Sequence, residues 1–304
     1  MKKEKNLFGE APLEGKPFIK WAGGKTQLEE IIINNLPSPF ETMDTYIEPF
    51  IGGGAIIFSV INRFPHIKRF IINDINPRLI NVYTTIQNSV DSLIEELSIL
   101  EKQYKNAEND DMKTELYLKK RKEFNEKTSS EIKDAALFIF LNRTCFNGLY
   151  RVNAKGLFNV PCGKYKNPNI CNTKLLIEDS LALQNVEILN GDYNQIFKFV
   201  TKNSFTYFDP PYRPISSSSS FNSYVENAFN DVEQIKLKEF CDKVHQIGGK
   251  FMLSNSDPKS KNINDVFFDE LYKNYNIQRV EARRNINSKG ENRGAITELL
   301  IKNY

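Results

Sequence analysis

Residues 45–74 have the sequence TYIEPFIGGGAIIFSVINRFPHIKRFIIND. The apolar run Thr45–Phe50 predicts a short buried strand, which leads into three consecutive glycines. The stretch Ala55–Phe64 then has helical character, and Phe70–Ile72 predicts a second strand, closed by Asn73-Asp74. Strand, glycine turn, helix and strand in this order are typical of a βαβ unit in a parallel, doubly wound sheet.

The same pattern continues on both sides of this unit. A helix is predicted over Thr26–Leu36, with Thr26 as its N-cap. Ser216–Ser220 is a low-complexity run, for which we expect a mobile loop. Further strands are predicted at Val186–Leu189, Phe205–Phe208, Lys250–Leu253, Tyr275–Ala282 and Ile296–Ile301.

Between the two sets of strands the alternation stops. Residues Pro77–Thr144 are polar and helix-patterned, and they end in an apolar helix, Ile132–Leu141. Gly, Asn and Pro residues then punctuate Phe146–Asn172, as is typical of hairpins and loops. We therefore expect one α/β domain, residues 1–76 and 173–304, interrupted by a helical and β-hairpin insertion, residues 77–172.

The composition excludes several classes of protein. Hydrophobic residues make up 40% of the 304 residues, which excludes a disordered chain. The start, Met1–Asn6, has no apolar segment of a secretory signal, and apolar runs such as Ala135–Leu141 are far shorter than the ~20 residues of a membrane span. Two histidines and four cysteines without a C-x-x-C pair argue against a metal site. We expect a cytoplasmic protein with no membrane contact and no metal.

The net charge of +3 does not by itself indicate nucleic acid, but its distribution is uneven. The window Ala135–Ile177 contains no Asp or Glu. Its basic residues are Arg143, Arg151, Lys155, Lys164, Lys166 and Lys174. A solvated surface accounts for such a window about as well as an anionic partner does.

The motif Asp209-Pro210-Pro211-Tyr212 follows a predicted strand. An acid at the carboxyl end of a parallel strand lies at the edge where α/β sheets bind ligands. The two prolines fix the backbone and leave carbonyl acceptors, and the aromatic ring of Tyr212 can lie against a planar base. Acceptors beside a stacking face suit an exocyclic amino group, although a structural turn is the simpler alternative.

Two further motifs suit a nucleotide-like ligand. Glycines between a strand and a helix allow close approach to a ligand, and Asp74, 20 positions after Gly54, has the spacing of an acid that binds ribose hydroxyls. The match to G-x-G-x-x-G is imperfect, because residue 57 is Ile. Trp21 is the one tryptophan, and its neighbours Lys20 and Lys25 favour an exposed ring beside a ligand over a place in the core.

These motifs occur in the order seen in a known family. Phe18–Lys25 (FIKWAGGK), the Glu48-Pro49-Phe50 glycine turn, Phe146–Asn153 (FNGLYRVN), Gly156–Pro161 with Gly163–Tyr165, and Asp209–Tyr212 follow one another along the chain. Together they resemble the Dam-type, class α DNA adenine-N6 methyltransferases. The resemblance covers Phe18 to Tyr304, including Arg293-Gly294, and implies a Rossmann-like S-adenosylmethionine-dependent methyltransferase sheet with an inserted DNA-recognition domain.

The resemblance also implies roles for residues. It implies catalysis by Asp209, Pro210, Pro211 and Tyr212. For S-adenosyl-L-methionine it implies Trp21, Lys25, Glu48, Phe50, Gly52, Gly54, Asp74, Asp192, Tyr193 and Asp209. For double-stranded DNA it implies Lys20, Phe146, Asn147, Leu149, Arg151, Pro161 and Tyr165. Phe146 and Asn147 match residues at the gap left by a flipped base; some relatives have Tyr at 146, so a hydroxyl role is absent here.

The implied reaction is methyl transfer to adenine N6 in duplex DNA. We expect Lys20 to contact the first base, a guanine, and Arg151 to contact the guanine that pairs with the last base, a cytosine. This assignment gives the site GATC. A restriction–modification role, with a cognate endonuclease that acts on the same site without direct contact, is compatible with the family. Three alternatives remain: N4-cytosine, RNA or protein-amide methylation on the same fold; a nucleotide oxidoreductase; and a non-catalytic DNA-binding module.

Overall fold

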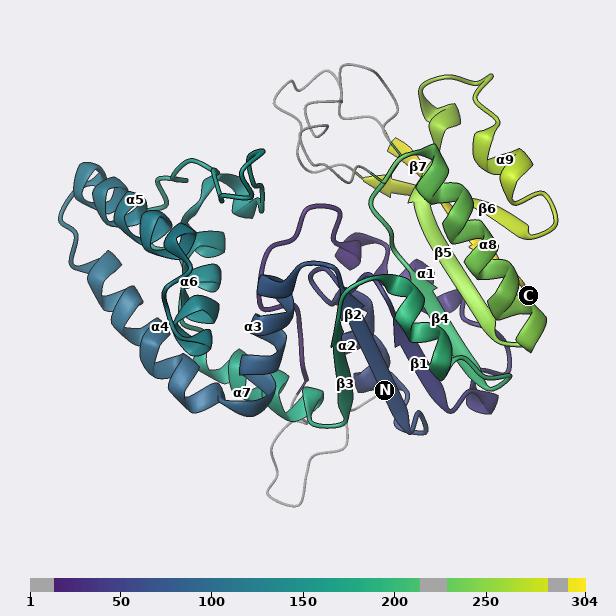
Figure 1. Cartoon of the computed structure of the whole chain (residues 1–304), viewed down its shortest axis with the longest axis horizontal. Helices are drawn as coiled ribbons and strands as arrows, with labels where there is room; N and C mark the ends of the chain where they lie inside the picture. Colours follow the sequence, from purple (N-terminus) through teal and green to yellow (C-terminus); the bar gives the residue numbers. More distant parts are fainter. Residues whose placement is uncertain (1–13, 214–228, 284–294) are drawn as a thin grey trace.

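A seven-stranded sheet forms the centre of the computed structural model, which describes residues 14–213, 229–283 and 295–304 (Figure 1). The strand order is β3-β2-β1-β4-β5-β7-β6. The first five strands pair in parallel, and β7 lies antiparallel between β5 and β6. The strands are β1 (Thr45–Glu48), β2 (Arg69–Asp74), β3 (Val186–Asn190), β4 (Ser204–Phe208), β5 (Lys250–Ser256), β6 (Asn276–Arg283) and β7 (Ala295–Lys302). The prediction of a doubly wound α/β sheet is confirmed.

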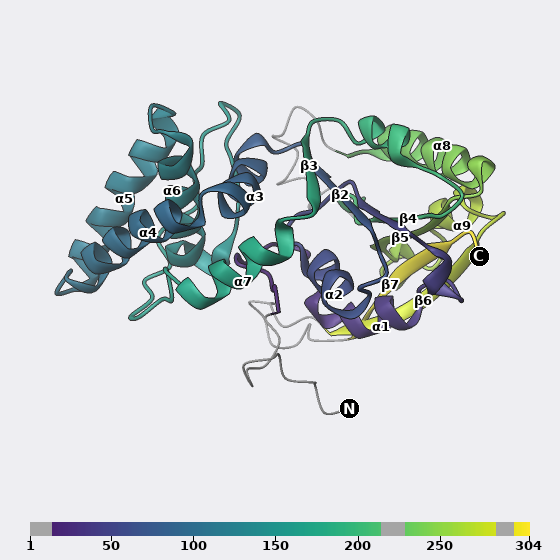
Figure 2. The same ribbon diagram turned by 90° about the horizontal axis from the view of Figure 1, so that it is seen from below.

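Helices cover both faces of this sheet (Figure 2). On one face α1 (Glu29–Asn34) and α2 (Ala55–Arg63) pack on the strands, and on the other lie the 3-10 helix η4 (Tyr193–Phe199), α8 (Asp231–Ile247) and α9 (Phe267–Leu271). Two apolar clusters result, one on each face. The buried strands β1 and β4 have no exposed side, which is why their sequences are apolar runs without alternation.

The predicted helix Thr26–Leu36 is wrong at its start. A 3-10 turn, η1 (Lys25–Gln27), comes first, and α1 begins only at Glu29. The N–H of Leu28 bonds to the carbonyl of Lys25, so the chain enters the helix from a tight turn. Thr26 is exposed inside that turn and does not cap the helix.

A layer of helices stands beside the β3 edge of the sheet. It consists of α3 (Pro77–Asn88), α4 (Val90–Lys105), α5 (Asp110–Glu126), α6 (Glu131–Thr144) and α7 (Thr173–Leu183). The apolar segment Ala135–Leu141 of α6 is buried on all sides, because α3, α4 and α5 pack around it. The helix predicted over Ile132–Leu141 is therefore confirmed.

The segment between α6 and α7 is irregular. It contains a short 3-10 turn, η3 (Phe146–Gly148), and two isolated antiparallel bridges, Cys145 with Cys162 and Val152 with Phe158. The predicted hairpin is present as these bridges rather than as regular strands. Ser216–Ser220 and Arg293-Gly294 lie outside the described residues.

No helix in the described ranges is long and apolar enough to cross a membrane. Within the same ranges, no group of three or more His, Cys, Asp or Glu side chains is arranged to hold a metal ion.

The glycine turn after β1 depends on close packing. Gly54 has a left-handed backbone (φ 74°), and a Cβ there would lie 2.5 Å from Oη of Tyr83, which donates to the carbonyl of Gly52. Gly156 also has a positive φ (68°), but a Cβ there would meet nothing within 4 Å. An alanine at Gly156 would therefore meet only backbone strain, whereas an alanine at Gly54 would meet backbone strain and steric overlap.

We expect Gly54→Ala to lower the free energy of unfolding more than Gly156→Ala does. The second change has only the left-handed backbone cost, about 1–2 kcal/mol. The first adds overpacking against Tyr83, about 1–3 kcal/mol. Urea denaturation of the two variants measures the difference, and equal losses would contradict the packing described for this turn.

Candidate active site

The carboxyl ends of three neighbouring parallel strands bring acids to one edge of the sheet. β1 ends at Glu48, β2 at Asp74, and Asp209 follows β4. Because β1 pairs in parallel with both β2 and β4, these ends meet at the same edge. The strand order reverses between β1 and β4, which is the place where doubly wound sheets bind ligands.

Asp209 lies in a short ion pair with Lys25. Nζ of Lys25 is 2.6 Å from Oδ1 of Asp209 and also donates to the carbonyl of Gly23 (3.1 Å). Oγ of Ser254, on β5, donates to the same carboxylate oxygen (3.2 Å). Burial raises the pKa of Asp209, and the charge and hydrogen bond of Lys25 oppose that rise. Lys25 therefore favours the ionised, hydrogen-bond-accepting form of the carboxylate.

The ring of Tyr212 lies beside this pair. Lys25 Nζ is 4.6 Å from the ring centroid, a cation–π contact. The Tyr212 hydroxyl donates to Oε2 of Glu298, on β7, at 2.6 Å. Gln234 of α8 donates to the carbonyl of Pro211 at 3.3 Å. Burial, then the charges of Asp209 and Glu298, raise the pKa of Tyr212, so its hydroxyl stays protonated.

Asp74 joins the end of β2 to the glycine turn. Its carboxylate accepts from the backbone N–H of Gly52 (3.2 Å) and of Asn76 (2.9 Å). The Asn76 side chain then caps α3. Burial raises the pKa of Asp74, and these backbone hydrogen bonds oppose the rise. The acid thus fixes the turn while each oxygen keeps acceptor capacity.

The end of β3 is tied to the same region. Nδ2 of Asn73 donates to the carbonyls of Pro49 and Gly191, both at 3.0 Å. Asp192 is exposed and caps η4 through the N–H of Asn194 (2.8 Å). The rings of Phe50 and Tyr193 lie 5.3 Å apart. The residues predicted to bind a cofactor therefore lie around adjacent strand ends.

Trp21 does not stand free beside the site, and the expectation of an exposed ring is wrong. The indole is half-buried and stacks on Tyr150 (5.7 Å) and Phe138 (6.4 Å). It also packs on Gly52 and Gly53, where a Cβ would come within 3 Å of it. The stack joins the glycine turn to α6. The Trp21 ring is therefore partly covered, although its neighbours in sequence include Lys20 and Lys25.

The predicted DNA-binding residues fall into one exposed segment and one residue facing it. Phe146 is 51% exposed, and Asn147, Arg151 and Pro161 are also exposed, whereas Leu149 and Tyr165 are half-buried. Lys20, from the N-terminal segment, holds its Nζ 5.0 Å from the ring centroid of Tyr165. The structure therefore brings Lys20 to the segment 146–165.

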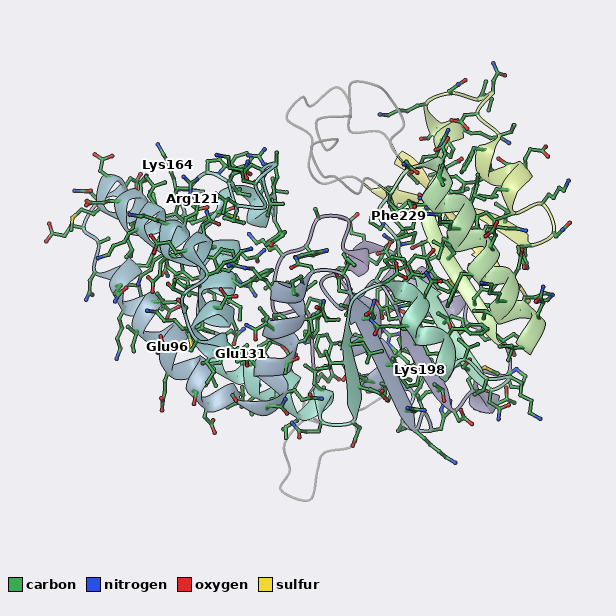
Figure 3. All side chains as sticks on the ribbon, in the orientation of Figure 1. Glu96, Arg121, Glu131, Lys164, Lys198 and Phe229 are labelled. Atoms are coloured by element: carbon green, nitrogen blue, oxygen red, sulfur yellow. The ribbon has the colours of Figure 1, made fainter. Side chains whose placement is uncertain are left out.

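Four labelled charged residues mark the two ends of the helical layer. In Figure 3, Arg121 and Lys164 lie at the end of the layer where the segment 146–165 is found. Glu96 and Glu131 lie at the opposite end. The acid-free window thus lies beside α5, which contributes both cations such as Arg121 and the acid Glu126 to the neighbouring hollow.

The model of the D12 class N6 adenine-specific DNA methyltransferases matches residues 21–286. The chain belongs to this family. It is 48% identical to the Type II methyltransferase M.MjaIII of Methanocaldococcus jannaschii over 96% of the chain and all of the relative. It is 36% identical to the Type II methyltransferase M1.LlaDCHI of Lactococcus lactis subsp. cremoris (98% and 99% covered) and 33% identical to the DNA adenine methylase of Haemophilus influenzae (95% and 93%).

Family membership decides among the functional classes. The chain is an adenine-specific DNA methyltransferase, and its sheet has the methyltransferase fold. The oxidoreductase and the non-catalytic module, two of the alternatives left open by the sequence, are excluded by this result.

Sequence reasoning missed Ser254 and Glu298. Ser254 follows the predicted strand Lys250–Leu253 by one residue, and so extends it to the same sheet edge. Glu298 is a single acid within the apolar run of β7, and that isolation was the available signal. Both side chains contact residues of the motif Asp209–Tyr212.

The Lys25–Asp209 pair predicts a pH-dependent stability. A carboxyl whose folded pKa lies above its unfolded value costs no stability at low pH. The loss of folding free energy caused by such a carboxyl grows as the pH rises from its pKa in the unfolded chain, about 4, through its pKa in the folded protein. Lys25→Met removes the opposing charge, so we expect its stability deficit to grow between about pH 4 and neutrality. Denaturation across pH measures this.

The matched control is Lys236→Met, whose lysine pairs with Glu233 on an exposed helix surface. Its deficit should be small at every pH, since exposed pairs contribute about 0–1 kcal/mol. A deficit of Lys25→Met that stays constant with pH would contradict the coupling to Asp209.

Proposed function

We propose that this methyltransferase transfers a methyl group from S-adenosyl-L-methionine to N6 of an adenine in duplex DNA, at GATC, after rotating the adenine out of the helix. The observation that carries the proposal is the Asp209 carboxylate, held by Lys25 beside the ring of Tyr212 at the switch point of the sheet. In this proposal residues 1–76 and 173–304 form the catalytic domain and 77–172 the recognition domain.

The chemistry requires an activated amine. The N6 lone pair of adenine is delocalised into the ring, so the amine is a poor nucleophile until its hydrogens are held by acceptors. Within the described residues both hydrogen bonds to Asp209 fall on Oδ1, which leaves Oδ2 for the substrate. Oδ2 and the Pro210 carbonyl would accept the two amine hydrogens, and the Tyr212 ring would hold the extruded base, whose unstacking costs a few kcal/mol.

The strand ends fit the methyl donor by their chemistry. Asp74 has acceptor capacity for ribose hydroxyls, and the aromatic pair Phe50 and Tyr193 borders the same edge. Glu48 and Asp192 add acceptors, while Trp21, Gly52 and Gly54 shape the turn that approaches the ligand. When bound, S-adenosylmethionine supplies an electrophilic methyl group on a sulfonium centre.

Recognition is assigned to the segment that faces Lys20. Arg151 can donate two parallel hydrogen bonds to guanine O6 and N7 in the major groove, and Lys20 can meet a guanine at the other end of the site. Leu149 and Pro161 offer apolar surface to a thymine methyl group, and Phe146 and Asn147 would fill the gap of the flipped base. Relatives named Type II methyltransferases support a restriction–modification role for this chain.

The family is adenine-specific, so N4-methylation of cytosine serves as the contrasting reaction in the test. The motif Asp209–Tyr212 suits exocyclic amines in general, so its geometry fits both bases. Tritiated methyl groups can be offered to a GATC duplex and to a matched duplex in which cytosine is present but the target adenine is replaced. Label on cytosine in either duplex would contradict the proposal.

We expect Asp209→Ala to lower the single-turnover rate by at least about 100-fold, the usual loss when one preorganised hydrogen-bonding group is removed. Duplex binding, measured by gel mobility shift, should be kept, because Asp209 is not among the base-reading residues. Asp44→Ala is the control, since Asp44 precedes β1 at the opposite edge of the sheet. An active Asp209→Ala enzyme, or a covalent adduct on a cysteine, would contradict the mechanism.

We expect Arg151→Ala to lose roughly 1–3 kcal/mol of discrimination at the fourth base pair, measured as kcat/KM on GATC against GATG. If Arg151 binds only phosphate, all sequences weaken alike and the salt dependence flattens by about one unit of slope. Lys155→Ala, an exposed cation of the same segment, is the control and should keep discrimination. Equal methylation of GATC and GATG by the unaltered enzyme would disprove the site.

A further inference from the structure

The side chain of Asn142 holds two parts of the recognition surface at once. Asn142 lies on α6 and is 3% exposed. Its Oδ1 accepts from the N–H of Lys20 (2.9 Å), and its Nδ2 donates to the carbonyl of Lys20 (2.8 Å). The same Nδ2 donates to the carbonyl of Gly148 (2.9 Å), which ends the turn η3. One amide thus satisfies both backbone groups of Lys20 and closes the turn that carries Phe146 and Asn147.

Beyond this clamp, the Lys20 side chain packs between Gly148 and Tyr165. Gly148 has a positive φ (64°), and a Cβ there would lie 2.5 Å from Cβ of Lys20 and 2.6 Å from its Cδ. On its other side the ammonium group lies over the ring of Tyr165. The direction in which Lys20 points is therefore set by Gly148, which Asn142 holds, and by Tyr165, whose carbonyl accepts from the hydroxyl of Tyr104 (2.7 Å).

Asn125 makes the same kind of clamp at Phe158, further along the segment. From α5, its Oδ1 accepts from the N–H of Phe158 (2.8 Å) and its Nδ2 donates to the carbonyl of Phe158 (2.9 Å). The next residue, Asn159, accepts from Nε of Arg151 (2.8 Å) through its side chain and from Nη2 (3.3 Å) through its carbonyl. Asn125 thereby fixes the extended stretch 158–160, on which the Arg151 side chain rests.

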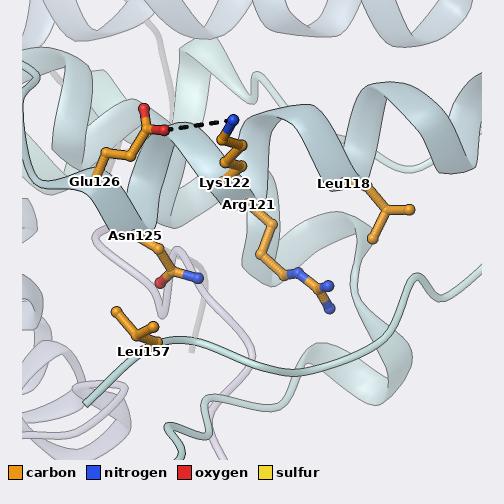
Figure 4. A pocket seen from close by; sticks show the side chains of 6 residues that line it. All are labelled: Leu118, Arg121, Lys122, Asn125, Glu126 and Leu157. Carbon is orange, nitrogen blue, oxygen red and sulfur yellow. Dashed lines mark ion pairs between the residues drawn. The ribbon is translucent and has the colours of Figure 1, made fainter. Parts of the chain in front are cut away.

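Figure 4 shows Asn125 in a hollow of about 390 Å³. Its lining residues are Leu118, Arg121, Lys122, Asn125, Glu126 and Leu157. In this hollow Nη1 of Arg121 donates to the carbonyl of Val160 (3.1 Å), and this second bond from α5 acts on the same stretch. Val160 is also held by the hydroxyl of Tyr117 (2.7 Å), so loss of the Asn125 amide would release Phe158 and Asn159 while Val160 stays anchored.

We propose that Asn142 and Asn125 are positioning residues that set specificity at opposite ends of the target site. Asn142 acts through Lys20 on the first base pair and through η3 on base extrusion. Asn125 acts through Asn159 and Arg151 on the fourth base pair. This inference rests on the proposed assignment of Lys20 and Arg151 as base readers, and it concerns residues that would never touch DNA.

The experiment compares Asn142→Ala and Asn125→Ala on three duplexes: GATC, one changed at the first pair and one changed at the fourth. Asn142→Ala should lose about tenfold in discrimination at the first pair and keep it at the fourth, since one base contact is worth about 1–3 kcal/mol of discrimination. Asn125→Ala should show the reverse. Asn81→Ala is the matched control, because Asn81 also donates to a backbone carbonyl, that of Glu131, away from the recognition segment.

Base extrusion gives a second readout. With 2-aminopurine in place of the target adenine, Asn142→Ala should lower the fluorescence gained on binding, whereas Asn125→Ala should leave it unchanged. Equal losses at both pairs in either variant mean a structural role only and overturn the inference. The inference is also overturned if Asn142→Ala loses discrimination at the fourth base pair, or Asn125→Ala at the first.

Lys20→Ala and Arg151→Ala serve as references. Sequencing of methylated adenines first shows which base pair each reference variant relaxes, so the comparison holds for whatever adenine site the enzyme prefers. Absence of adenine methylation would refute the proposed function itself, whereas a Lys20→Ala variant that relaxes no pair would overturn only the inference. Asn142→Asp, which keeps the acceptor for the Lys20 N–H, is the second variant; if neither Asn142 variant folds by circular dichroism, the clamp is structural and the inference fails.

Discussion

The ion pair between the buried Lys25 and the half-buried Asp209 connects the N-terminal segment to the end of β4. Charges removed from water are costly unless each finds partners. Lys25 has the carboxylate, the carbonyl of Gly23 and the ring of Tyr212, and Asp209 has Ser254 in addition. The pair fixes the position of η1, because moving that turn would leave both charges unpaired. Lys25 is itself the first residue of η1, so the constraint acts on the turn that precedes α1.

The segment Phe18–Lys25 consequently reaches both parts of the molecule. Its carbonyl at Phe18 accepts from Arg143, its backbone at Lys20 is clamped by Asn142, and its indole at Trp21 stacks against α6. Only four residues separate Lys20, which faces the segment 146–165, from Lys25, which holds Asp209. The helical layer and the sheet are therefore joined by a short peptide whose polar groups are satisfied by side chains from both. This explains why the sequence motif of this segment mixes cations, glycines and a tryptophan.

The sheet was predictable from the sequence because its central strands are apolar runs closed by polar residues, and Asp74 and Asp209 mark two of those ends directly. The pairing of Lys25 with Asp209 was not predictable, since 184 positions separate them and no local pattern reports the contact. Trp21 was misjudged because its neighbours in sequence are polar, whereas its neighbours in space, Phe138 and Tyr150, come from the helical layer. Asn142 lies within an apolar helix, and only the fold shows that its amide serves backbone groups 122 positions away.

The acids at the sheet edge differ in their protonation. Burial raises the pKa of Glu48 well above its usual range, with the hydrogen bond from Tyr46 opposing and the charge of Asp209 adding to the rise. Glu48 therefore favours its neutral form, while Asp209 and Glu298 share the single ammonium group of Lys25. Two carboxyl groups thus lie around one ammonium group, and this excess of acidic side chains suits a cationic ligand. Under the proposed function the donor is a sulfonium cation and the product left after transfer is neutral at sulfur, so these side chains would attract the donor more strongly than the product and favour the exchange of bound product for a new donor molecule.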